Sequence, residues 1–368
     1  MNKKIVSVGT IFVLILSLVN FSVTSLNIDK EMNNDLKENS FEDQQNNFNN
    51  NFDIRIISIP LISNKTLQTI NSFDLDIIDV NESFIIAYAT DEQIEYLLLE
   101  GFEPRILYNN YNEMMGFDKY PEMLYSFHNY NQMTTELQSI ASTYPSIAKL
   151  YELGQSVQGR SIWGLKITDN PNIEENEVEL RYCGAHHGDE YMSVEIPLLF
   201  AWDLVENYTV DPEITDLIDN REIWIIPMVN PDGREMGQRR NANNVDLNRD
   251  YGYMWSGAGS SPSPFSQPET QTIREHALDN NIVLSYTYHT AAQYVNYIWN
   301  YKPQPTPDEP WIIMISDVYG DFSGYVPING FDWYQTTGDT NDFSYGCYGG
   351  IDTTIETLNS NIAYEWNI

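Results

Sequence analysis

Short alternating apolar runs fill residues 52–108, and two stretches with helical spacing separate them. The runs FDIRIISI, LDIIDV, SFIIAYAT and EPRILY have the period of strands; NKTLQTINS and DEQIEYLLLEG have that of helices, the second opened by Asp91. The order strand, helix, strand, strand, helix, strand is typical of a ferredoxin-like split βαβ unit. We therefore predict a small α+β unit here, and its lack of histidine and cysteine indicates that it carries no chemical site.

From about residue 119 the pattern changes to longer helices that alternate with buried strands. An amphipathic helix, NYNQMTTELQSIASTYPSI, ends before Tyr144 and Pro145. The strands VELRYCGA, EIWIIPMVN and NIVLSYTYH follow, with helices between them. This alternation predicts an α/β domain over residues 119–368, with a mixed, largely parallel twisted sheet and helices on both faces.

Two prolines mark the expected course of later helices. Ser266 and Glu269 flank Pro268 in the pattern of a capping box, which predicts a helix start there. Pro197 lies inside the helical run SVEIPLLFAWDLVENY, so we expect this helix to be kinked or to start later.

The first 118 residues also contain segments outside the α+β unit. Residues 1–25 combine two lysines, a short apolar run and small residues, which is typical of a secretory signal peptide. An uncleaved membrane anchor is the competing interpretation. Residues 26–51 are rich in Asn, Asp and Glu and predict a disordered spacer, and residues 109–118 form a linker.

Charge and cysteine content restrict the function classes. The formal net charge is −34, from 53 acidic and 19 basic residues, which argues against nucleic acid or an anionic membrane surface as the main partner. No second long apolar run follows the signal, so we expect a secreted or cell-surface protein without stable membrane insertion; the oligomeric state stays open. The two cysteines, Cys183 and Cys347, do not make a disulfide scaffold, and we expect two separate buried thiols.

A candidate metal site lies at the carboxyl ends of two predicted strands. VELRYCGA runs into His186 and His187, Glu190 follows three positions after the second histidine, and His289 ends the strand NIVLSYTYH. Two histidines and one glutamate are the protein ligands of a catalytic zinc with an open position. The spacing alone leaves open which neighbouring histidine is the ligand. Asp246 is the candidate carboxylate partner of His187.

The remaining histidines are assigned structural roles. His128 lies in the first helix region, and His276 lies on a helix that looks exposed. Neither falls at the end of a predicted strand, where the site is expected.

The motifs GAHHGDE, RRNANNVDLNRDYGYMW, YTYH and DWYQTTGDTNDFSY, with the later TTIET, together resemble the zinc carboxypeptidases of the funnelin type, the M14 metallopeptidases. The resemblance covers residues from about 119 to 368. It implies one Zn²⁺ per catalytic domain, bound by His187, Glu190 and His289. His186 is then a neighbour that packs or forms hydrogen bonds.

The resemblance also implies how substrate is bound and cleaved. Asn248 and Arg249 match the pair that holds the free carboxylate of a peptide or protein C-terminus, a task suited to arginine. Arg239 matches the arginine that polarises the scissile carbonyl, and Tyr334 matches the mobile tyrosine that closes over the terminus. Glu356 matches the glutamate that takes a proton from the attacking water and passes it to the leaving amine. The ferredoxin-like unit matches an inhibitory prosegment, with processing in the linker.

The resemblance also bears on which substrate side chains are accepted and on whether the domain is complete. Asn341 stands where members carry their discriminating pocket residue, and Asp339 stands two positions earlier, so we expect broad preference for apolar or aromatic side chains, with basic ones accepted through Asp339. Capping of a turn by Asp339 is the alternative. Gly188 and Asp189 replace an arginine of pancreatic-type members, and TAAQ follows His289 where the family has other residues. The family continues into a further helix after Glu356, so we expect a fragment or an incomplete domain.

Two other functions are consistent with the same residues. One is a peptidase of this family that cleaves γ-D-glutamyl bonds to diamino acids in cell-wall peptides. The other is a non-catalytic peptide-binding protein with a carboxypeptidase-like domain. The presence of Glu356 together with all three ligands argues against the second.

Overall fold

The computed structural model describes residues 54–61, 70, 73, 75–80, 83–109, 111–114 and 127–359. The predicted signal peptide, the spacer, most of the helix expected at 64–72 and residues 115–118 of the linker lie outside these residues. Across the described part of the chain, no helix is both long and apolar enough to span a bilayer.

The N-terminal unit is a four-stranded antiparallel sheet in the order β2-β3-β1-β4, the strand order of a ferredoxin-like unit. Its elements are β1 (Ile54–Pro60), β2 (Asp76–Val80), β3 (Phe84–Thr90), α4 (Asp91–Leu99), β4 (Arg105–Tyr108) and α5 (Tyr111–Met114). Helix α4 begins at Asp91, but its cap is Thr90, which forms a capping box with Gln93. Alternate residues of β1 and β3 are buried in a small apolar core of this unit.

The large sheet has eight strands in the order β11-β10-β12-β9-β7-β8-β6-β5. They are β5 (Ala148–Gln155), β6 (Ser161–Ile167), β7 (Val178–Cys183), β8 (Arg221–Ile226), β9 (Ile282–Ala291), β10 (Tyr294–Tyr297), β11 (Val326–Asn329) and β12 (Ile351–Asn359). The central strands β12, β9, β7 and β8 are parallel, while β10 pairs antiparallel with β12, and β6 with both of its neighbours. The prediction of a mixed, largely parallel sheet is therefore confirmed.

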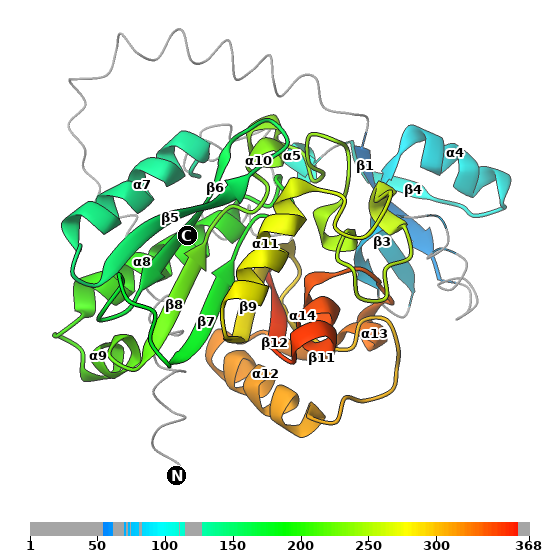
Figure 1. The fold of residues 1–368 in the computed structure, drawn as a ribbon. Helices are drawn as coiled ribbons and strands as arrows, with labels where there is room; N and C mark the ends of the chain where they lie inside the picture. The colour runs from blue at the N-terminus through cyan, green and yellow to red at the C-terminus, as the bar shows by residue number, and fades with distance from the viewer. Residues whose placement is uncertain are drawn as a thin grey trace, which may run out of the picture.

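Helices cover both faces of this sheet (Figure 1). They are α7 (Tyr130–Thr143), α8 (Met192–Asn207), α9 (Pro212–Ile218), α10 (Pro231–Met236), α11 (Pro268–Asp279), α12 (Glu309–Ser323), α13 (Gly330–Trp333) and α14 (Thr340–Tyr348), with 3-10 turns η2 (Leu247–Arg249) and η3 (Ala258–Ser260). Helix α7 ends at the residue before Tyr144, as the proline pattern predicts, and α8 runs through Pro197 rather than starting after it.

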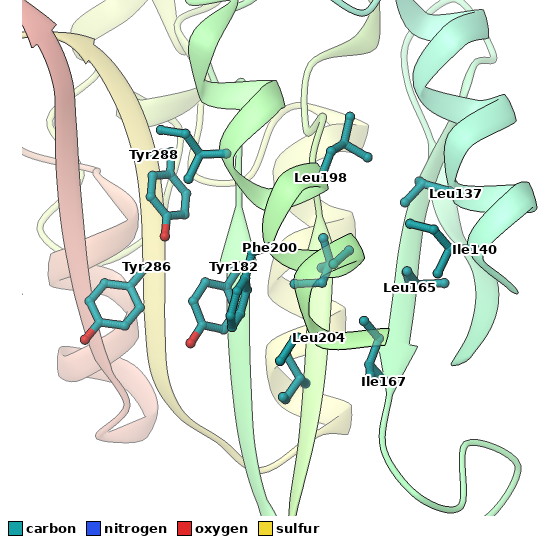
Figure 2. Close-up of a cluster of buried hydrophobic side chains, with 14 of the residues drawn as sticks. Leu137, Ile140, Leu165, Ile167, Tyr182, Leu198, Phe200, Leu204, Tyr286 and Tyr288 are labelled. Carbon is teal, nitrogen blue, oxygen red and sulfur yellow. The ribbon is translucent and has the colours of Figure 1, made fainter. Parts of the chain in front are cut away.

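Alternation along β7 and β9 divides the sheet into two apolar layers. Tyr182, Tyr286 and Tyr288 lie in the layer formed with α8 and α12 (Figure 2). The ring of Tyr182 packs against Phe200 of α8, and the ring of Tyr286 packs against Tyr319 of α12. Cys183, the next residue after Tyr182, lies in the layer formed with α11 and α14. Both layers are buried, and the strands that carry the candidate site are therefore held rigidly from two sides.

Three expectations about single residues are wrong. His276 is buried, with 6% of its surface exposed, because α11 packs on the sheet near Trp224. Both cysteines are free, but Cys347 is exposed, whereas Cys183 is buried. Helix α11 begins at Pro268 without a side-chain cap, since Ser266 donates instead to Asp250 and Glu269 accepts from the amide of Asn241.

The burial of His276 predicts acid-sensitive stability. Burial, with the charge of Arg181 nearby, lowers the pKa of His276 to about 3, and among the described residues neither ring nitrogen has a hydrogen-bond partner. The unfolded chain binds a proton below about 6.5 and the folded one does not, so stability falls as the pH falls from there, by at most about 1.4 kcal/mol per pH unit. In His276→Leu the free energy of unfolding should depend less on pH between 7.5 and 5.5. Parallel curves for the two proteins would contradict this.

Candidate zinc centre and active site

Three candidate ligands meet at the carboxyl ends of β7 and β9. His187 and Glu190 lie in the turn between β7 and α8, and His289 lies near the end of β9, which pairs in parallel with β7. Their ligand atoms lie within 4.8 Å of one another, and all three side chains are buried. Parallel pairing of β7 with β9 therefore brings His187 close to His289, which lies 102 positions away in the sequence.

The donor set fits a zinc ion. The Nδ1 atoms of His187 and His289 are 3.0 Å apart, and the Glu190 carboxylate lies 2.8 Å from the first and 2.9 Å from the second. A tetrahedral metal with bonds of about 2.1 Å holds its ligand atoms about 3.4 Å apart, close to these distances. Two imidazole nitrogens and one carboxylate are ligands that suit zinc.

His186 turns away from this cluster. Its Nε2 lies 2.8 Å from the hydroxyl of Tyr251, and the ring is fully buried. Burial, with the neighbouring histidines, holds the pKa of His186 well below its usual value. The neutral ring thus packs under the site, beside the ring of His289.

Asp246 connects the candidate ligand His187 to Arg239 and Asn248. One of its carboxylate oxygens lies 3.0 Å from Nε2 of His187 and accepts from the backbone amide of Asn248 at 2.8 Å. The other accepts from Nη2 of Arg239 at 3.1 Å. A carboxylate on the distal nitrogen of a metal-binding imidazole fixes its tautomer and orientation.

Arg239 borders the same space as the ligands. Its Nη1 lies 3.0 Å from Nδ1 of His187 and 3.5 Å from the Glu190 carboxylate, while Asp246 holds its other nitrogens. The guanidinium is buried, so its charge acts in a poorly solvated site.

Glu356 faces the ligands from the adjacent strand. It lies on β12 directly opposite His289 in the parallel register, and only 8% of its surface is exposed. Burial and the charge of Glu190 raise the pKa of Glu356 to about 8, although His187, Arg239 and Arg249 oppose that rise. A cation among the ligands would favour its ionised form. A carboxyl so placed can exchange a proton near neutral pH.

Asn248, Arg249 and Tyr334 also come together. The side-chain oxygen of Asn248 accepts from the amide of Thr340 at 3.1 Å, and Nη1 of Arg249 donates to the carbonyl of Asn248 at 2.8 Å. Tyr334 is partly buried, packs against the core of the N-terminal unit and forms a hydrogen bond with Arg249.

Asp339 and Asn341 lie at the start of α14. Asp339 is the N-cap: one oxygen accepts from the amide of Asp342 at 2.9 Å and the other from the hydroxyl of Thr336 at 2.7 Å. Asn341 accepts from Thr354 at 2.7 Å, two residues before Glu356 on the same strand. Both oxygens of Asp339 are thus engaged, which favours the capping role.

One buried residue beside the site, Asp250, is not among the residues predicted from the sequence. Asp250 directly follows Arg249, and its carboxylate accepts from four donors between residues 261 and 270. Its only signal in the sequence is its position in the motif NRD, because its partners lie beyond a loop.

Comparison with known proteins identifies the family of this chain. The profile of the zinc carboxypeptidase family (Peptidase M14) matches residues 133–363. Human carboxypeptidase D is 32% identical over 269 residues, or 62% of this chain and 19% of that protein. A zinc carboxypeptidase from Saccharothrix mutabilis subsp. capreolus is 36% identical over 159 residues, or 39% of this chain and 37% of that protein. The chain therefore spans well under half the length of these relatives.

The same fold is found among solved structures. Carboxypeptidase A from Helicoverpa armigera superposes with a TM-score of 0.70 at 21% identity, covering 83% of this chain and 89% of that one. The α/β sheet carries a buried His-Glu-His cluster that could hold a metal ion. Because the zinc carboxypeptidase profile matches residues 133–363, more than half of the chain, the chain belongs to the zinc carboxypeptidase family.

Proposed function

We propose that this protein hydrolyses the C-terminal peptide bond of peptides and proteins, with Glu356 as the general base. The observation that carries the proposal is the position of Glu356, which is buried on β12 opposite His289, beside the ligand cluster. Zinc held by His187, Glu190 and His289 would supply a Lewis acid that polarises the carbonyl and acidifies water. Digestion of a peptide library with and without chelator, followed by identification of the released residues, tests the proposal.

The roles of the protein groups follow from charge and position. Glu356 accepts the proton of the attacking water and delivers it to the leaving amine. Arg239, fixed by Asp246, presents a buried positive charge to the oxygen on which negative charge develops. Asn248 and Arg249 bind the terminal carboxylate, with Tyr334 closing over it, since a guanidinium can pair with both carboxylate oxygens.

The side-chain preference is proposed to be broad. Asn341 is uncharged and offers no partner to a cation, so apolar and aromatic C-terminal residues should be accepted. Support for basic side chains through Asp339 is weak, because Thr336 and the amide of Asp342 engage its carboxylate. The rates of Phe and Arg release from a matched peptide pair measure this preference; a dominant Arg rate would restore a charge-pairing role for Asp339.

We further propose that the protein is secreted and that the N-terminal unit keeps it latent. Two contacts support latency. Tyr334 packs against the apolar core of that unit, and the ring of Tyr88, on β3, lies 5.9 Å from the guanidinium carbon of Arg239. Both catalytic-domain residues belong to the proposed substrate site, so peptide and N-terminal unit compete for the same space.

Cleavage in the linker should therefore raise activity. A unit that leaves the site open for about 1% of the time lowers activity about 100-fold, and cleavage removes that factor. Tyr88→Ala should raise the residual activity of the intact precursor. The matched control is Tyr96→Ala, on α4 of the same unit, where the side chain is 53% exposed. Equal hydrolysis of a small substrate by precursor and cleaved protein would contradict inhibition.

A further inference from the structure

The loop of residues 257–267 lies directly behind Arg249 and Asp246. The carbonyl of Gly259 accepts from the amide of Asp246 at 2.9 Å. A Cβ atom at Gly259 would lie 2.7 Å from the Cβ atoms of both Arg249 and Asp246, which is too close for any side chain. The φ of Gly259 is +66°, in the left-handed region that favours glycine. This loop is therefore the support against which the two side chains pack.

Asp250 fastens this loop to the segment that carries Arg249. One carboxylate oxygen accepts from the hydroxyls of Ser261 and Ser266. The other accepts from the amide of Gln267 at 3.0 Å and from the hydroxyl of Thr270. Asp250 is fully buried, and its own carbonyl accepts from the amide of Phe265 at 2.6 Å. A buried carboxylate with four neutral donors holds the loop firmly, because its loss would take the acceptor from the buried amide of Gln267 and from the hydroxyl of Ser266.

We propose that Asp250 and Gly259 are positioning residues for recognition of the substrate's terminal carboxylate. They act through Arg249, so this inference rests on the proposed function. Two-point pairing between a guanidinium and a carboxylate requires a fixed orientation, and a displacement of about 1 Å can cost about 100-fold. The hydrogen bonds of Asp250 to the loop fix the orientation of the Arg249 guanidinium, while Arg249 itself contacts the substrate.

Asp250→Asn is the first test. The amide keeps the size of the carboxylate but replaces one acceptor oxygen with a donor group, so one pair of contacts to the loop is lost. For a blocked dipeptide with a free C-terminal carboxylate, KM should rise about tenfold while kcat stays within about twofold, because ground-state binding of the terminus is weakened. The preference for 3-phenylpropanoate over its amide as an inhibitor should shrink by the same factor. Gly259→Ala should raise KM further and should also lower kcat, because its Cβ would press on Asp246, the partner of His187 and Arg239, as well as on Arg249.

Two controls separate weaker binding of the terminal carboxylate from general destabilisation: the zinc content of Asp250→Asn, which should stay near that of the parent, and a matched variant elsewhere in the fold. Glu179→Gln alters another buried carboxylate, which accepts from Trp224 and from the amide of Asn281 at the opposite end of β7. It should leave KM and inhibitor preference unchanged. Should Asp250→Asn fail to fold, Ser266→Ala removes one donor from the same carboxylate and decides with the same measurements. If Asp250→Asn loses thermal stability but keeps the KM and the inhibitor preference of the parent, the positioning role is wrong while the proposed function still stands. A parent protein that does not distinguish acid from amide would overturn the proposed function together with it.

Discussion

Glu356→Gln is expected to lower kcat by about 10³–10⁴-fold, because the amide keeps the shape of the side chain but cannot accept a proton. The residue is buried opposite His289, but an amide of equal shape should not displace the ligands. Zinc content and the affinity for 3-phenylpropanoate should therefore stay near those of the parent. Steady-state kinetics on a blocked dipeptide, with metal analysis of the same samples, measures all three quantities.

Glu179→Gln is again the appropriate control, since it makes the same chemical change in a buried carboxylate remote from the ligands. Turnover by Glu356→Gln within a few-fold of the parent would place the general base on another residue. Loss of zinc together with turnover would instead assign Glu356 a role in metal binding.

His187→Ala should abolish both zinc binding and hydrolysis, because it removes one of three protein ligands and leaves Asp246 without its imidazole partner. His186→Ala should retain about one zinc per chain, since that ring bonds to Tyr251 and stays out of the cluster. His186→Ala is a stringent control for His187→Ala, because the two residues share a turn and only their side chains point in different directions.

His186→Ala is expected to reduce stability rather than metal binding. Removal of the buried ring creates a cavity and leaves the Tyr251 hydroxyl without this partner, which costs about 2–4 kcal/mol. Equal loss of zinc in the two variants would mean that the ligand assignment is wrong.

Periodicity and strand ends predict most of the architecture that positions the centre. The runs that end before His186 and at His289 are central parallel strands, and parallel strands bring their carboxyl ends to one edge. The choice between His186 and His187, however, depends on the direction of each side chain in a turn, which the spacing alone does not determine. The resemblance selected His187, and the structure places that residue in the cluster.

Local sequence is a weaker guide where long-range contacts compete. Ser266 looks like a helix cap, but the buried carboxylate of Asp250, 16 residues earlier, takes its hydroxyl. His276 lies in a polar helical run, yet α11 packs that residue edge-on against Trp224 of β8. The two possible roles of Asp339 are equally compatible with the sequence, and only the direction of its carboxylate toward Thr336 and Asp342 favours the cap.

The most direct measurement uses two blocked dipeptides that differ only at the C-terminus, one with a free carboxylate and one with a carboxamide. The linker-cleaved, zinc-loaded protein is incubated with each, with and without a chelator, and the released product is quantified. We expect release of the C-terminal residue from the free acid, little or none from the amide, and loss of all release with chelator until zinc is restored. Equal cleavage of acid and amide, or cleavage that the chelator does not affect, would contradict it.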